Sequence, residues 1–152
     1  MSRLRLATEA DIPTLVNMAA AMHAASSFAP LTYSPEKMAQ TLAHGISTGF
    51  VAVSVDEEGG DITGAIYGDV VEPCWSHDRM GIEVGLYVSP ERRGSRGALM
   101  LVAAWIRWCV ASGAKQIRPG TAATSPAADR LYRSMGFEPA GALYVLNQKD
   151  FP

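Results

Sequence analysis

The sequence predicts a single α/β domain in which helices flank one mixed, mainly antiparallel sheet. Its length of 152 residues is typical of one domain with a core of its own. Hydrophobic residues make up 48% of the chain and charged residues 18%, as in a globular protein. Strand-like and helical segments are mixed without a regular βαβ order, and no repeat or linker divides them. We therefore expect one domain over residues 1–152.

The first half of the chain predicts a strand, two helices and a hairpin. Residues 3–7 alternate as in a strand, and a capping-box-like start at Thr8 and Asp11 precedes a helix. A Ser-Pro pair at 34–35 begins the second helix. Two apolar runs then surround a turn rich in acidic residues and glycine, which predicts a hairpin of strands 50–55 and 62–71.

The second half of the chain predicts four strands and two helices. After an irregular loop, residues 82–88 form a strand that ends at a Ser-Pro pair. A Gly- and Arg-rich loop follows, and then an amphipathic helix over 98–111. A strand begins at Gln116, a helix follows from 125 to 134, and two last strands are expected within 137–148.

Composition excludes several classes of function. A net charge of -2 leaves no basic face for a nucleic-acid backbone, although the arginines of the Gly-rich loop are a local exception. No apolar run approaches a membrane span and no signal segment is evident, so we expect a cytoplasmic protein. The three histidines and two cysteines show no ligand spacing, which predicts no metal site.

The strand-loop-helix over residues 84–99 is the most informative segment. Unpaired N–H groups at the start of a helix, small residues and arginines together favour a diphosphate. The pattern is neither GxGxxG nor GxxxxGK[ST], so a dinucleotide fingerprint and a P-loop are not supported. A solvated turn before an ordinary helix is the alternative.

Within this segment, PERRGSRGA at 90–98 resembles the coenzyme A loop of the GNAT (Gcn5-related N-acetyltransferase) family, Q/R-x-x-G-x-G/A. Arg93 takes the first position and Ala98 the last, while Arg96 replaces the first glycine, as in a subgroup with R-G-x-R. The opening RLAT with Asp11, and LYRSMGF at 131–137, are also similar to family segments. The resemblance covers nearly the whole chain. It implies transfer of an acyl group, with acetyl-CoA as donor, to a primary amine by direct attack.

The resemblance also implies where the cofactor binds. Strand 82–88 and strand 116–120 should splay apart, and the pantetheine arm should enter the gap. Ser125 would contact this arm, although it is also a plain helix N-cap. The cofactor-binding residues expected are Leu86, Tyr87, Val88, Arg93, Gly94, Ser95, Arg96, Gly97, Ala98, Ser125 and Tyr132.

Two residues are expected to carry the chemistry. The family motif places Tyr132 beside the coenzyme sulfur, where a phenol can protonate the leaving thiolate. Glu83, a carboxylate in an apolar strand, is the candidate base, and alternation predicts it on one face with Gly85 and Tyr87. Packing alone for Tyr132 and a solvent-facing Glu83 are the alternatives. A water molecule or His77 is the other candidate for the base.

Four carboxylates are expected to border the acceptor cleft: Asp69, Glu72, Asp78 and Glu83. A cleft of that charge favours a cationic amine over an anion. The identity of the amine, and whether the acyl group is acetyl or longer, stay open. So do a homodimer and a non-catalytic acyl-CoA-binding module on the same fold.

Overall fold

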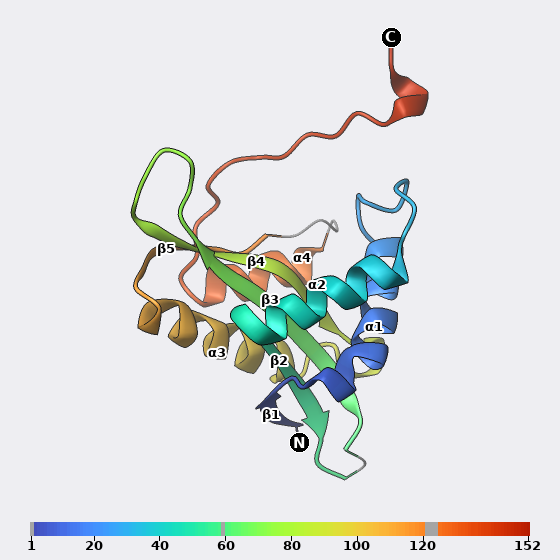
Figure 1. Ribbon diagram of the computed structural model, residues 1–152, viewed down its shortest axis with the longest axis vertical. Coiled ribbons are helices and arrows are strands. Elements are labelled where there is room, and N and C mark those ends of the chain that lie inside the picture. Colours follow the sequence, from blue (N-terminus) through green and yellow to red (C-terminus); the bar gives the residue numbers. More distant parts are fainter. Residues whose placement is uncertain (1, 59, 121–124) are drawn as a thin grey trace.

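The computed structural model describes residues 2–58, 60–120 and 125–152, and has one five-stranded sheet with helices on both faces (Figure 1). The strands lie in chain order, β1-β2-β3-β4-β5. The first four are antiparallel, and β5 joins β4 in parallel. Their bounds are Ser2–Leu6, Phe50–Asp56, Ile62–Val71, Arg79–Val88 and Ala114–Arg118. The mixed, mainly antiparallel sheet predicted from the sequence is confirmed.

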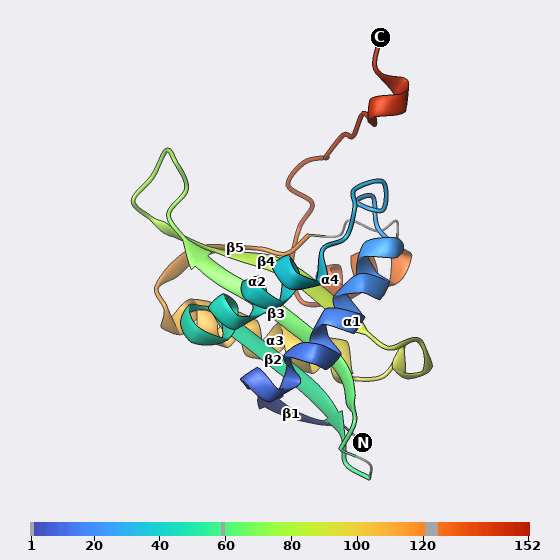
Figure 2. The same cartoon turned by 45° about the vertical axis from the view of Figure 1, so that its right-hand side comes forward.

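The described residues form four α-helices, which cover this sheet in two layers (Figures 1 and 2). They are α1 (Ile12–Ala24), α2 (Pro35–Thr48), α3 (Gly97–Ala111) and α4 (Pro126–Ser134). On one face, α1 and α2 bury side chains such as Leu15 and Leu42 against Val53 of β2. On the other face, Trp105 of α3 is fully buried in a cluster that also receives residues of α4. Burial of apolar surface on both faces stabilises the sheet as the middle layer.

The helix starts predicted from the sequence are confirmed. Thr8 and Asp11 form a capping box around a short 3₁₀ turn (Glu9–Asp11) that leads into α1. Asp11 also accepts two hydrogen bonds from Arg5 at 2.7 and 2.9 Å, and these hold its pKa at about 2. Ser34 caps α2 through the backbone N–H of Lys37. These local contacts fix where the helical layer begins beside β1.

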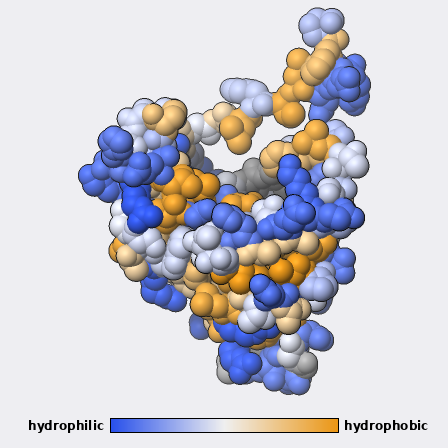
Figure 3. All heavy atoms as spheres, in the orientation of Figure 1, coloured by the Kyte–Doolittle hydropathy of each residue, from blue (hydrophilic) through white to orange (hydrophobic). Residues whose placement is uncertain are grey.

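The prediction of two last strands within 137–148 is wrong. The structure describes no strand there, only a short 3₁₀ turn at Gln148–Asp150. Figures 1 and 3 show this C-terminal segment leading away from the body of the molecule, with hydrophobic atoms exposed along it. The side chain pattern is compatible with strands, but a strand also needs a neighbour for its backbone hydrogen bonds. In the part of the chain that the structure describes, this segment pairs with no strand.

Among the described residues, no helix is both long and apolar enough to cross a membrane. Both cysteines are free thiols, Cys109 in the core and Cys74 in the exposed loop between β3 and β4. Burial raises the pKa of the Cys109 thiol to about 11, so this side chain stays protonated and packs as a small apolar group.

Candidate active site

The sheet opens between its last two strands. β5 pairs only with the first part of β4, from Arg79 to Ile82. Beyond that point β4 continues to Val88 while β5 has ended at Arg118. Among the described residues, no strand pairs with the edge of β4 that faces away from β3 over residues 83–88. The expected splaying of these two strands is confirmed. The gap offers an extended ligand a strand edge with free hydrogen-bonding groups.

A β-bulge in β4 decides which way Glu83 points. Tyr67 of β3 lies opposite Gly85, whereas the next residue of β3, Gly68, lies opposite Glu83, so Val84 is an extra residue. The prediction that Glu83 shares a face with Gly85 and Tyr87 is wrong, because the extra residue reverses the alternation. Gly85 and Tyr87 line a cavity beside α1 and α2, while Glu83 points to the opposite face.

On that face Glu83 meets Tyr132 of α4. The phenol Oη donates a hydrogen bond of 2.6 Å to Glu83 Oε2, and lies 3.3 Å from the carbonyl oxygen of Gly120. The two residues predicted separately for the chemistry are thus in direct contact. Since a charge-assisted O–H···O⁻ bond of this length is strong, the pair acts as one unit.

Burial raises the pKa of the Glu83 carboxyl to about 7, and hydrogen bonds from Tyr132 and the backbone of Gly120 limit the rise. Burial also raises the pKa of the Tyr132 phenol, and the charge of Glu83 and the hydrogen bond to it add to that rise. At neutral pH Tyr132 is therefore protonated, while Glu83 exchanges a proton readily. This is the protonation range that general acid–base catalysis requires.

The start of α4 and the turn after it position Tyr132. Ser125 caps the helix by accepting a hydrogen bond of 3.3 Å from the N–H of Ala128, and Pro126 follows at the first helical position. The predicted N-cap is confirmed. At the other end the Tyr132 ring packs edge-on against Phe137, with ring centroids 5.8 Å apart. Both contacts limit the freedom of the phenol.

The Gly- and Arg-rich loop lies at the far end of β4 and leads into α3. Arg92 anchors it through an ion pair of 2.6 Å with Asp56, the last residue of β2. Arg93 is exposed, and its Nε donates to the carbonyl of Val88 at 3.3 Å. Gly94 has a φ of +84°, a left-handed conformation that suits glycine. Ser95 and Arg96 are exposed, whereas Gly97 is buried where α3 begins.

The loop thus brings the predicted cofactor residues from Arg93 to Ala98 to the N-terminus of α3. The first N–H groups of any α-helix lack partners within the helix, and the helix dipole favours an anion there. Exposed arginine side chains on the same loop add positive charge. The arrangement is suited to a diphosphate at the end of the open β4 edge.

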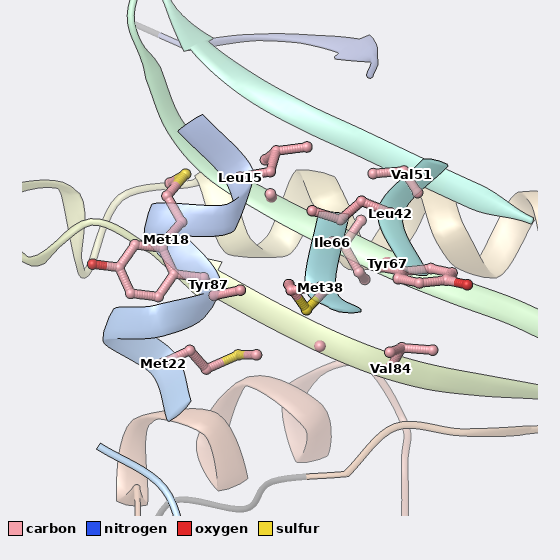
Figure 4. Close-up of a pocket in the computed structure, with 13 residues that line it drawn as sticks. Leu15, Met18, Met22, Met38, Leu42, Val51, Ile66, Tyr67, Val84 and Tyr87 are labelled. Carbon is pink, nitrogen blue, oxygen red and sulfur yellow. The ribbon is translucent and has the colours of Figure 1, made fainter. Parts of the chain in front are cut away.

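An apolar cavity of about 100 Å³ lies on the other side of β4, beneath α1 and α2 (Figure 4). Three methionines line it, Met18 and Met22 from α1 and Met38 from α2, together with the rings of Tyr67 and Tyr87. Val84 and Gly85, the residues directly after Glu83, form its floor. A side chain at position 85 would come within 2.8 Å of the Met22 methyl group. The sequence pattern did not predict this cavity, because its methionines lie on two separate helices.

Three of the carboxylates expected at the acceptor cleft, Asp69, Glu72 and Asp78, lie outside the apolar cavity. Asp78, in the loop before β4, forms an ion pair of 2.8 Å with Lys115. Glu72 lies 3.4 Å from the fully exposed His77 in the same loop. Asp69 accepts a hydrogen bond from the neighbouring backbone N–H. None of these three carboxylates lines the apolar cavity. No group of three or more possible metal ligands occurs among the described residues.

The sequence was also compared with models of known protein families. The model of the acetyltransferase (GNAT) family matches residues 18–137, most of the chain. This protein belongs to the GNAT acetyltransferase family. The match includes β4, the Gly- and Arg-rich loop and α4, the elements around the open edge. A search of curated proteins found no match.

Several solved structures share the GNAT fold at low sequence identity. A predicted acetyltransferase from Clostridium acetobutylicum, solved with acetyl-CoA, is 16% identical, has a TM-score of 0.80, and covers 99% of each chain. The aminoglycoside N-acetyltransferase AAC(6')-Iy, in complex with a bisubstrate analogue, is 14% identical with a TM-score of 0.76, over 97% of this chain and 98% of its own. Glucosamine-6-phosphate N-acetyltransferase from Arabidopsis thaliana is 12% identical with a TM-score of 0.75, over 97% and 99%.

Proposed function

We propose that this GNAT protein transfers an acetyl group from acetyl-CoA to a primary amine without a covalent enzyme intermediate. One observation carries the proposal. A carboxyl with a pKa of about 7 is hydrogen-bonded to a protonated phenol beside an unpaired strand edge. No thiol competes as a nucleophile there, since Cys109 is buried in the core and Cys74 lies in the exposed loop before β4.

The donor would bind along elements that are already in place. Backbone groups around Leu86 and Val88 on the open edge would pair with the amides of the pantetheine arm. The loop from Arg93 to Ala98 would hold the diphosphate at the start of α3. Ser125, at the start of α4, would contact the arm from the other side of the gap. In this placement the thioester comes to lie near Tyr132, and the aligned amide groups fix its orientation.

Glu83 and Tyr132 would then act as a proton relay. Glu83 takes a proton from the amine as the nitrogen attacks the thioester carbonyl and the C–S bond breaks. Tyr132 gives its phenolic proton to the departing sulfur and regains one from Glu83. The amine proton thus ends on the thiol of CoA, and both residues return to their initial states.

The shifted pKa values explain why the two transfers would be coupled. The negative charge of Glu83 raises the pKa of Tyr132 and makes it a poor proton donor in the resting state. Once Glu83 is protonated, that charge is gone and the phenol becomes more acidic. Tyr132 therefore becomes a better proton donor to sulfur once Glu83 has taken the proton of the amine.

The apolar cavity supports a particular class of acceptor. Its floor is formed by the residues that follow Glu83, and its lining of methionine, leucine and tyrosine side chains offers no charged group. An acceptor amine that carries a small aliphatic or aromatic group would bury that group there, and its nitrogen would reach Glu83 on the opposite face past the open edge of β4. Methionine side chains adapt to different shapes, so the site would accept several related amines.

The proposal is tested by the release of free CoA thiol from acetyl-CoA across a panel of amines. We expect turnover with primary amines that carry an apolar group, and weak turnover with amines whose substituents are strongly acidic. Acetyl-CoA should also raise the melting temperature of the protein. A thermal shift without turnover of any amine would indicate the non-catalytic binding module instead. No thermal shift and no turnover would overturn the proposal.

A further inference from the structure

The Gly- and Arg-rich loop lies against the end of the β2–β3 hairpin. Arg92 of this loop pairs with Asp56, the last residue of β2, although 36 residues separate them in the chain. The distance between Arg92 Nη2 and Asp56 Oδ2 is 2.6 Å. A backbone hydrogen bond of 2.9 Å from the N–H of Ser89 to the carbonyl of Thr63 joins the start of the loop to β3. The hairpin thus holds the loop at two points.

The Asp56 carboxylate has a fixed position on this hairpin. Its other oxygen, Oδ1, accepts a hydrogen bond of 3.4 Å from the backbone N–H of Glu58. The backbone of Asp56 closes the turn, since its N–H donates to the carbonyl of Asp61 and its carbonyl accepts from the N–H of Gly60, both at 2.8 Å. The Asp56 side chain is only 20% exposed, so water and salt screen the ion pair less than a surface pair. Asp56 therefore offers Arg92 a rigid partner.

The middle of the loop has only local side-chain hydrogen bonds in the part of the chain that the structure describes. Residues 93–96 are all exposed. The side chains of Arg93 and Ser95 bond to the backbone of residues five and two positions away. The conformation of the loop before a ligand binds therefore depends on the pair between Arg92 and Asp56.

We propose that Asp56 is a positioning residue for acetyl-CoA, which it does not touch. By holding Arg92, it keeps the loop in the conformation that directs the N–H groups at the start of α3 toward the diphosphate. Arg92 then serves the contact with the hairpin, while Arg93 and Arg96 stay free for the phosphates. A preformed loop loses less conformational freedom on binding, which raises the affinity. The inference rests on the proposed use of acetyl-CoA and adds a residue to it.

The negative charge of Asp56 and its positioning role have opposite effects on the binding of an anion. A carboxylate near the loop repels an anionic cofactor, so its neutralisation would by electrostatics alone tighten binding. Release of Arg92 from the pair would add a free cation to the loop, with the same result. A positioning role predicts weaker binding, because the loop loses its support. The direction of the change in affinity therefore decides between the two.

Calorimetric titration of acetyl-CoA into the variant Asp56→Asn measures this direction. Asparagine keeps the size of the side chain and can still accept from the N–H of Glu58, so the change removes the charge. We expect the Kd to rise about two- to fivefold, the worth of a partly exposed ion pair. Asp11→Asn is the matched control, since it breaks an ion pair of similar exposure with Arg5, just before α1. This control should lower the melting temperature and leave the Kd unchanged.

Exchange of the two charges provides a second test. Arg92→Asp alone should weaken binding, and its combination with Asp56→Arg should restore part of the affinity, because the pair is rebuilt at the original total charge. No restoration would show that Arg92 itself contacts the cofactor, which would overturn the inference. Unchanged or tighter binding in Asp56→Asn would overturn it as well, while leaving the proposed function intact. No binding of acetyl-CoA to the unmodified protein would overturn both.

Discussion

At the scale of single residues, Glu83 and Tyr132 are in contact, and their pKa values suit the two groups to different roles in proton transfer. The carboxyl, with a pKa of about 7, changes its charge near neutral pH, whereas the phenol, with a raised pKa, keeps its proton. Each residue influences the titration of the other across the 2.6 Å hydrogen bond. Rates measured against pH should therefore report on the pair and not on either residue alone.

The variant Glu83→Gln should lower the rate at neutral pH by roughly 10²–10⁴-fold, since it removes the proton acceptor. In the unmodified protein the carboxyl must be ionised to act, so kcat/KM should fall as the pH drops below about 7. The variant should lack this dependence, and its deficit should shrink at high pH, where free amine is abundant. A rate near normal in the variant would contradict the role of Glu83. Unchanged affinity for acetyl-CoA serves as the control.

The variant Tyr132→Phe separates the two residues. It removes the proton donor to sulfur, so kcat should fall. It also removes a hydrogen bond that lowers the pKa of Glu83. The acid limb of the residual activity should therefore move above pH 7. A variant that loses activity with the limb unmoved would show that Tyr132 acts without contact to Glu83. The comparison of pH profiles distinguishes this role from simple packing of α4.

At the scale of elements, the bulge in β4 and the loop before α3 lie at the two ends of the open edge of β4. The loop is recognisable in sequence because its chemistry is local: arginines and small residues come directly before a helix. The bulge is not recognisable in sequence, because it depends on how β3 and β4 pair along their length. Alternation within β4 alone therefore put Glu83 on the wrong face. Its proximity to Tyr132 arises from the packing of α4 and is likewise invisible to local patterns.

The position of Arg93 in this loop predicts a specific effect on cofactor binding. Arg93→Ala should weaken acetyl-CoA binding about ten- to a hundredfold, the worth of one charge-assisted hydrogen bond to phosphate. The fold should be unaffected, because Arg93 is exposed. Arg133→Ala is a matched control, since it removes an exposed arginine that pairs with Asp129 on α4. Calorimetric titration measures both. Equal loss of affinity for acetyl-CoA and for its pantetheine fragment in Arg93→Ala would contradict a diphosphate contact.

At the scale of the whole molecule, β1 to β4 pair in antiparallel order, whereas β5 separates from β4 after Ile82. The antiparallel hairpin and the helix starts were predictable because turns, caps and apolar spacing encode them within a few residues. The C-terminal strands were not, because the apolar pattern of residues 142–146 shows only that a strand can form there. Whether it forms depends on pairing with a neighbouring strand, and among the described residues the segment 142–146 pairs with none.

The central claim is that the open edge of β4 binds acetyl-CoA, with its thioester at the Glu83–Tyr132 pair. Amide NMR shifts recorded during a titration with acetyl-CoA test it most directly. We expect the largest changes in residues 83–88 of β4 and 93–98 of the loop, with β1 and α2 nearly unaffected. Changes at residues remote from this edge, or no saturable change at all, would contradict the claim.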